Sequence, residues 1–183
     1  MTLWLVRHAR PPVEPGLCYG ALDVAADGEA TLAAAQALAS ELPKGLIVCV
    51  SPAQRCQQLA LALHLRRPDV HLQTDARLCE MDFGIWEGVA WSQIPKDALD
   101  AWTSAFGSHR CGGRESANEV LARTALAWDE AHPAGLAQPH RAWITHAGVI
   151  RAAHLLSNNM RSVSRADQWP VDAPAFGQWT TLA

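Results

Sequence analysis

Two histidines and two arginines of this chain lie just after short apolar segments. Arg7 and His8 directly follow one apolar run, Arg55 lies shortly after a second, and His146 follows a third. If these runs are neighbouring parallel strands, the polar side chains meet at one edge of a sheet, outside the carboxyl ends of the strands. Arginine binds anions through a planar fork of donors, and a neutral imidazole is a competent nucleophile. The spacing therefore predicts an anion site that contains a nucleophile.

The elements that must position these residues are visible in the hydrophobic pattern. Short apolar runs predict strands at Leu3–Val6, Leu46–Ser51, Val70–Thr74 and Arg141–Thr145. Helical periodicity predicts helices from Asp27 to about Leu42, from Ser51-Pro52 to about Leu65, from near Ser116, and after Gly148. Strands that alternate with helices predict an α/β fold with a mostly parallel sheet covered on both faces.

Local signals mark where these helices begin. Asp27 is a suitable N-cap for the first helix, and Leu32, Leu38 and Leu42 are among its apolar positions. Ser51 is an expected cap for the second helix, with Pro52 in its first turn. The stretch 79–114 is rich in Trp, Gly and Pro, and we expect it to be mostly loop. Because no repeat or linker interrupts the chain, we expect a single domain over 1–183.

Composition excludes several classes of protein. Of the 183 residues, 49% are hydrophobic and 18% charged, which is typical of a globular domain. The formal net charge of −3 argues against binding to nucleic acid or to an acidic membrane, and no apolar run is long enough to span a bilayer. Five cysteines without a CxxC pair support neither a disulfide framework nor a zinc knuckle. We therefore expect a cytoplasmic protein without a membrane segment.

Seven motifs occur together in one order along the chain. They are Leu5-Val6-Arg7-His8, Asp27-Gly28-Glu29-Ala30, Ser51-Pro52-x-x-Arg55, Glu80-x-Asp-Phe-Gly-x-Trp-Glu87-Gly88, Gly112-Gly113-Arg-Glu115-Ser116, Arg123, and Thr145-His146-Ala147-Gly148-Val-Ile-Arg151. In this combination the chain resembles the histidine phosphatase superfamily, also called phosphoglycerate mutase-like, over nearly its whole length. The resemblance implies a three-layer α/β sandwich and a small phosphomonoester as the substrate, with no metal and no other cofactor.

Phosphoryl transfer explains why these residue types are needed. A histidine that attacks phosphorus divides one slow hydrolysis into two easier displacements, and His8 is the expected nucleophile. The transferring group carries charge on its equatorial oxygens, so Arg7 and Arg55 are expected to hold it. His146 and the backbone N–H groups that begin at Ala147 add further donors at the start of a helix.

The reaction also needs an acid that protonates the leaving oxygen and then deprotonates water. Three carboxylates close in sequence qualify, namely Glu80, Asp82 and Glu87. Spacing does not separate them, whereas the resemblance favours Glu80. The other histidines are expected to be surface or packing residues; they are His64, His71, His109, His132, His140 and His154.

Two positions depart from the pattern of the superfamily. Ala9 replaces the glycine that usually follows the Arg-His pair, and Glu14 stands where many members carry a phosphate-binding asparagine. A carboxylate directed inward would repel phosphate. We therefore expect the loop to turn Glu14 outward, leaving Cys18, Tyr19 and Gly20 to line the pocket.

The compact length favours hydrolysis over mutase activity. The segments Arg7–Pro12 and Cys18–Asp23 look most like the α-ribazole phosphatases of cobalamin assembly, which act on α-ribazole 5′-phosphate or cobalamin 5′-phosphate. Indoles of Trp86, Trp91 and Trp102 are suited either to stack on a planar base or to pack a lid onto the sheet. A sugar-phosphate phosphatase, a phosphoglycerate mutase and a non-catalytic phosphate-binding protein remain alternatives, and a homodimer is compatible with the sequence.

Overall fold

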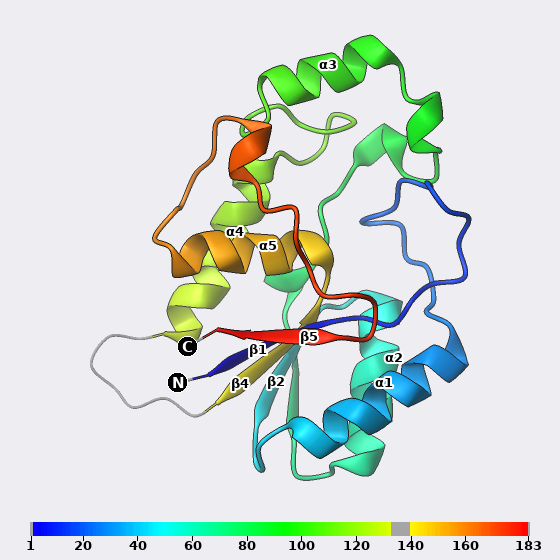
Figure 1. Cartoon of the computed structure of the whole chain (residues 1–183), viewed down its shortest axis with the longest axis vertical. Helices are drawn as coiled ribbons and strands as arrows, with labels where there is room; N and C mark the ends of the chain where they lie inside the picture. Colours follow the sequence, from blue (N-terminus) through cyan, green and yellow to red (C-terminus); the bar gives the residue numbers. More distant parts are fainter. Residues whose placement is uncertain (1, 133–139, 183) are drawn as a thin grey trace.

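A central five-stranded sheet organises the computed structural model, which describes residues 2–132 and 140–182. Its strands are β1 (Leu3–Arg7), β2 (Ile47–Val50), β3 (His71–Thr74), β4 (Arg141–Thr145) and β5 (Trp179–Leu182). Their order is β3-β2-β4-β1-β5, with the first four parallel and β5 antiparallel to β1 (Figure 1). The predicted α/β class with a mostly parallel sheet is confirmed.

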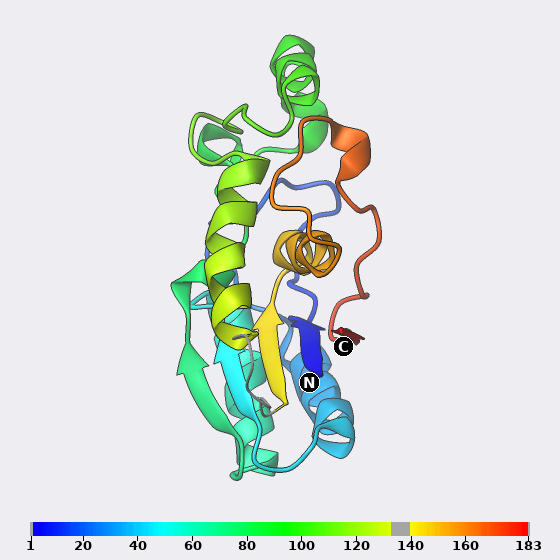
Figure 2. The same cartoon turned by 90° about the vertical axis from the view of Figure 1, so that its left-hand side faces the viewer.

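Helices cover both faces of this sheet. The helices are α1 (Gly28–Glu41), α2 (Gln54–Arg66), α3 (Lys96–Ser104), α4 (Ala117–Ala131) and α5 (Ala147–Ser157). The pairs α1 with α2 and α4 with α5 pack against each other on opposite faces, and α3 lies at the end of the molecule farthest from α1 and α2 (Figures 1 and 2). Within 2–132 and 140–182, no helix combines the length and apolarity needed to cross a bilayer.

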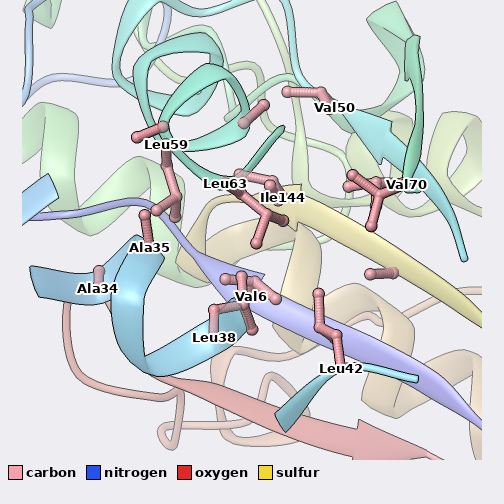
Figure 3. Close-up of a cluster of buried hydrophobic side chains, with 14 of the residues drawn as sticks. Val6, Ala34, Ala35, Leu38, Leu42, Val50, Leu59, Leu63, Val70 and Ile144 are labelled. Carbon is pink, nitrogen blue, oxygen red and sulfur yellow. The ribbon is translucent and has the colours of Figure 1, made fainter. Parts of the chain in front are cut away.

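Alternation along the strands divides the core in two. Val6 of β1 and Ile144 of β4 pack against Ala35 and Leu38 of α1, together with α2 (Figure 3). Their strand neighbours Leu5 and Trp143 point to the other face, toward α4 and α5. Because successive side chains of a strand point to opposite faces, continuous apolar runs are what a sheet buried on both sides requires. Both faces of β1 are therefore buried, which fixes where its last residue lies.

Two details of the helices differ from the sequence prediction. Helix α2 begins at Gln54, with Ala53 as an N-cap that makes no side-chain bond, so Ser51 does not cap it and Pro52 precedes it. Ser51 directly follows β2 and is tied to the neighbouring strand, because its N–H donates to the Ile144 carbonyl at 3.0 Å. Leu32 is 51% exposed rather than part of the apolar face, since that face of α1 turns away from the sheet.

Other local predictions are confirmed. The Asp27 side chain accepts a hydrogen bond from the Ala30 N–H and caps α1, and Ser116 forms a capping box with Glu119 at the start of α4. The stretch 79–114 is mainly loop with short 3₁₀ turns, but it also contains α3. Its side chains, several of them aromatic, pack with α4 and α5 into a third apolar cluster.

Candidate active site

The carboxyl ends of three parallel strands meet at one pocket. Arg7 is the last residue of β1, Ser51 follows β2, and His146 follows β4. The backbone keeps these ends in register, since the His8 N–H donates to the Thr145 carbonyl at 3.1 Å. The resulting pocket has a volume of about 250 Å³, and its lining includes Arg7, His8, Arg55, Glu80, His146 and Ala147. The structure thus brings all six sequence-predicted site residues to one cavity.

His8 is buried and has one ring nitrogen committed to the backbone. Its Nδ1 lies 2.7 Å from the carbonyl oxygen of Ala9, which can only accept, so Nδ1 carries the proton and donates. The pKa of His8 is lowered to about 3, chiefly by burial and in part by the charges of Arg55 and Arg7, while the hydrogen bond to Ala9 opposes the shift. At neutral pH the ring is therefore uncharged, with the lone pair on Nε2.

Arg55 is held in place by backbone carbonyls. Its side chain is 1% exposed, Nη1 donates to the Leu22 carbonyl at 3.0 Å, and Nη2 donates to the Gly20 carbonyl at 2.6 Å. Its Nε is buried and has no hydrogen-bond partner in the part of the chain that the structure describes. A guanidinium that lines the pocket and is held in one position is suited to bind an anion.

Arg7 is fixed by the segment that precedes β5. Its Nη1 donates to the Pro174 carbonyl at 3.1 Å, and its guanidinium carbon lies 3.8 Å from the ring centroid of Phe176. The same Phe176 ring lies 5.4 Å from the ring of His8, centroid to centroid. Burial lowers the pKa of Arg7, while Tyr19 and Glu80 raise it. Phe176 is a site residue that sequence reasoning missed, because no local motif marks it.

The three candidate carboxylates have different surroundings. Asp82 accepts from the Gly84 N–H and lies 3.3 Å from the Arg114 Nε, on a neighbouring cavity of about 600 Å³. Glu87 lines none of the three cavities described here and accepts from the N–H groups of Gly20, Ala21, Leu22 and Phe83. Of the three, only Glu80 lines the pocket that contains His8.

Glu87 has a structural task that its spacing did not reveal. Its carboxylate gathers four backbone N–H groups at 2.9–3.0 Å and so fixes the loop 20–22. The carbonyls of Gly20 and Leu22 in that loop are the ones that hold Arg55. Glu87 therefore acts on the anion pocket through the loop and not directly.

Glu80 is oriented from both sides. Its Oε1 accepts from the Met81 N–H at 3.0 Å, and its Oε2 accepts from the Gly148 N–H in the first turn of α5 at 3.1 Å. Arg123 donates to the carbonyls of Cys79 and Glu80 at 2.6 and 3.1 Å and forms an ion pair with Glu115. These contacts fix both the backbone and the carboxylate of the proposed acid.

His146 is the N-cap of α5 and is completely buried. Its Nε2 lies 2.8 Å from the Ser51 Oγ, and its ring centroid lies 5.1 Å from that of His8. Burial first, and then the charge of Arg55, hold the pKa of His146 well below its usual value, so the ring is neutral. Ser51 is thus a neighbour of the site, although its sequence pattern indicated a different role.

The departures from the superfamily pattern are accommodated. Ala9 is 1% exposed, and Asn159 is the one residue other than glycine with a positive φ in 2–132 and 140–182, so the backbone at Ala9 does not need glycine. Glu14 is exposed and does not line the pocket, as expected. Tyr19 lines it, but Cys18 and Gly20 do not: the Cys18 side chain is buried in the apolar cluster of α4 and α5, and Gly20 lines the neighbouring cavity of about 600 Å³.

An aromatic cavity of about 230 Å³ adjoins the anion pocket. Glu80, Phe83, Trp91 and Arg151 line both cavities, and Trp102, Phe106 and Trp169 add further walls to the aromatic one. The indole of Trp102 stacks on Trp91 at a centroid distance of 5.9 Å. Trp86 is 6% exposed and packs edge-on against both indoles. Trp86 is thus packed inside this cluster, whereas Trp91 and Trp102 also face a cavity.

The remaining histidines line none of these three cavities; they are His64, His71, His109, His132, His140 and His154. Across residues 2–132 and 140–182, no three His, Cys, Asp or Glu side chains are grouped so as to hold a metal ion. His132 stacks on Trp128, with ring centroids 3.9 Å apart.

Solved structures of phosphatases are similar to this chain. Mycobacterial glucosyl-3-phosphoglycerate phosphatase aligns with a TM-score of 0.78 and 25% identity, over 98% of this chain and 88% of that one. Its complex with VO3 aligns with a TM-score of 0.79 over 100% and 90%. The TTHB049 protein of Thermus thermophilus, at 23% identity and a TM-score of 0.71 over 100% and 93%, shares the fold.

A comparison with curated protein sequences gives no significant match. A family model, in contrast, matches residues 3–174, which include every residue of the anion pocket and most of the motifs that position it. With its strand-end histidines, its buried Arg55 and this match over most of its length, the chain belongs to the histidine phosphatase superfamily, branch 1.

Proposed function

We propose that the protein is a phosphomonoesterase that works through a phosphohistidine formed on His8 Nε2. One observation carries the proposal: a neutral, buried imidazole with a free Nε2 shares a pocket of about 250 Å³ with three arginines, Arg7, Arg55 and Arg151, and one carboxylate. Membership of the histidine phosphatase superfamily and the phosphatase activity named for similar structures support a hydrolase.

The reaction proceeds in two displacements. In the first, His8 Nε2 forms a bond to phosphorus while the ester P–O bond breaks, and Glu80 gives its proton to the departing oxygen. In the second, Glu80 takes a proton from water, the hydroxide oxygen bonds to phosphorus, and the N–P bond breaks to release inorganic phosphate. Arg7, Arg55 and His146 hold the equatorial oxygens in both steps.

For the substrate, we propose α-ribazole 5′-phosphate or cobalamin 5′-phosphate. The support is the aromatic cavity that shares Glu80, Phe83 and Trp91 with the anion pocket, because indole and phenyl walls beside a phosphate site favour a planar, apolar leaving group. The activity named for similar structures favours a second candidate, a phosphorylated sugar acid. Mutase activity and non-catalytic phosphate binding are the other outcomes of the tests below.

Trapping the intermediate tests the mechanism. The protein is mixed with a ³²P-labelled phosphomonoester and quenched in base, in which phosphohistidine survives better than in acid. Label should remain on the wild type and on His64→Ala, which changes an exposed histidine of α2, and should be absent from His8→Ala. Turnover at the wild-type rate by His8→Ala would contradict the proposal, and so would inactivation by a chelator, since the proposed steps need no metal.

Substrate comparison tests the leaving group. The ratio kcat/KM is measured for α-ribazole 5′-phosphate, glucosyl-3-phosphoglycerate and 3-phosphoglycerate. We expect the first to be preferred, and Trp91→Ala to reduce that preference while p-nitrophenyl phosphate hydrolysis changes less. A preference for either glycerate ester excludes the cobalamin assignment but leaves the phosphohistidine mechanism intact.

A further inference from the structure

His146 and Ser51 form a completely buried pair. Both side chains have no solvent exposure, and the Ser51 Oγ lies 2.8 Å from the His146 Nε2. The two residues directly follow β2 and β4, which are neighbours in the sheet. A contact this short between buried polar groups must be a hydrogen bond, and its direction decides which ring nitrogen of His146 carries the proton.

The other partners of Ser51 indicate that direction. The Ser51 Oγ already accepts from the Ala53 N–H at 3.3 Å, so its oxygen receives a proton from the backbone. The thiols of Cys56 and Cys79 also approach this hydroxyl, but sulfur is a weak acceptor. Within 2–132 and 140–182 the one strong acceptor in hydrogen-bond contact with the Ser51 O–H is His146 Nε2. If Nε2 carried the proton instead, the buried hydroxyl would lose that acceptor.

The neutral state of His146 then fixes its second nitrogen. Because burial and the positive charge of Arg55 keep the ring uncharged, it carries one proton, and an Nε2 that accepts leaves that proton on Nδ1. His146 Nδ1 is itself buried and has no hydrogen-bond partner among the described residues, although the ring belongs to the lining of the anion pocket. A buried N–H donor without an acceptor is costly, so a ligand oxygen is expected to satisfy it.

We propose that Ser51 is a positioning residue, which donates to His146 Nε2 and thereby presents Nδ1–H of His146 to a phosphoryl oxygen. The role of that N–H rests on the proposed phosphatase function, whereas the tautomer itself does not. Ser51 makes no direct contribution to the phosphate contact. Its hydroxyl acts through the imidazole, by excluding the tautomer whose Nδ1 lone pair would repel the phosphoryl group.

Histidine nitrogen NMR tests the tautomer directly. In protein labelled with ¹⁵N-histidine and free of ligand, the signals of His146 are assigned by their loss in His146→Gln. We expect a protonated Nδ1 and an unprotonated Nε2 that accepts a hydrogen bond, and in Ser51→Ala we expect the proton to move to Nε2 in part or all of the molecules. A wild type with the proton on Nε2 overturns the proposal, whether or not the protein is a phosphatase.

Kinetics tests the consequence. Ser51→Ala should lower kcat/KM for p-nitrophenyl phosphate by roughly ten- to a hundredfold, the usual cost of removing a residue that orients a site residue. It should also weaken competitive inhibition by inorganic phosphate. Ser51→Thr keeps the hydroxyl and should recover most of the loss. Thr124→Val removes a buried hydroxyl of α4 that lines no described cavity, and should leave kcat/KM unchanged. Wild-type kcat/KM in a folded Ser51→Ala, with the proton still on Nδ1, overturns the proposal.

If instead the NMR spectra show the expected tautomer and the protein hydrolyses no phosphomonoester, the inference about Ser51 stands and the proposed function fails. The two failures are therefore distinguishable.

Discussion

The carboxylate of Glu80 occupies the space that a side chain at Gly148 would need. A Cβ on Gly148 would lie 2.2 Å from the Glu80 Oε1, while the Gly148 N–H donates to Oε2 at 3.1 Å. The glycine in the Thr-His-Ala-Gly motif has no positive φ, so the motif needs it for space and not for backbone conformation. One residue thus provides both the donor and the room that orient the proposed acid.

Gly148→Ala should displace Glu80 and leave the fold intact. Because a shift of about 1 Å at a reacting group commonly costs on the order of a hundredfold in rate, we expect kcat/KM to fall by about that factor. The matched control is Gly28→Ala in the first turn of α1, where an added Cβ has nothing within 4 Å. Equal activity of the two variants on an alkyl phosphate would show that Glu80 is not held as described.

Glu80→Gln should affect substrates according to their leaving groups. A glutamine cannot donate the proton that an alkoxide leaving group needs. We therefore expect kcat for an alkyl phosphate to fall by about 10²–10⁴-fold, the usual range for general acid catalysis. p-Nitrophenyl phosphate releases a stable phenolate and should lose much less. Asp82→Asn, a change outside the anion pocket, serves as the control and should alter neither rate strongly. Equal losses on both esters in Glu80→Gln would assign the acid elsewhere.

Glu87→Gln should weaken the loop that holds Arg55. The carboxylate accepts hydrogen bonds from four backbone N–H groups. In glutamine an NH₂ group replaces one of the two oxygens and cannot accept from those N–H donors. We expect the free energy of unfolding to fall by about 2 kcal/mol, the scale of losing hydrogen bonds to a charged group. Urea unfolding measures this change, and kinetics should show a raised KM for phosphate esters. A purely catalytic role would instead lower kcat with stability unchanged.

Acid should destabilise the protein through its two buried histidines. The pKa of His8 is lowered to about 3 and that of His146 lies well below its usual value, in both cases mainly through burial. Below the ordinary histidine pKa of about 6.5 the unfolded chain binds protons that the folded state does not bind, so stability falls as the pH falls from about 6.5 toward 3. In that window each histidine lowers the free energy of unfolding by up to about 1.4 kcal/mol for each pH unit of acidification.

The measurement is urea unfolding between pH 4 and 7.5 in buffers without phosphate, since a bound anion would add stability of its own. His8→Asn should reduce the slope by the contribution of one histidine. His64→Asn, a change to an exposed ring of α2, is the matched control. An identical slope in wild type and His8→Asn would mean that His8 titrates normally in the folded protein.

Much of the fold could be predicted because its signals are local. Short apolar runs followed by polar residues predicted β1, β2 and β4, since strands buried on both faces consist mostly of apolar residues. Strand β5 gave no such signal: it is only four residues long, and at the edge of the sheet three of its residues are partly exposed and one is exposed. Helix α3 has no fully buried residue and follows a cluster of tryptophans, so its periodicity was hidden.

For the site, sequence patterns identified residue types but not their partners. Ser51 followed by Pro52 has the local signature of a helix start, yet its hydroxyl bonds to a residue 95 positions away along the chain. Glu80, Asp82 and Glu87 were equivalent by spacing, and only the cavity and the backbone N–H groups around them separate their roles. Such long-range contacts are set by packing, which no local motif records.

The position of β1 inside the sheet also determines when the pocket can exist during folding. Both neighbours of this strand, β4 and β5, come from the opposite end of the sequence, and the Gly177 N–H reaches back to the carbonyls of Arg7 and His8. Contacts between residues so far apart form late and slowly, because the entropy of closing a long loop must be overcome first. Recovery of phosphatase activity should therefore report completed folding of the chain, and a partly folded intermediate that lacks β4 should be inactive.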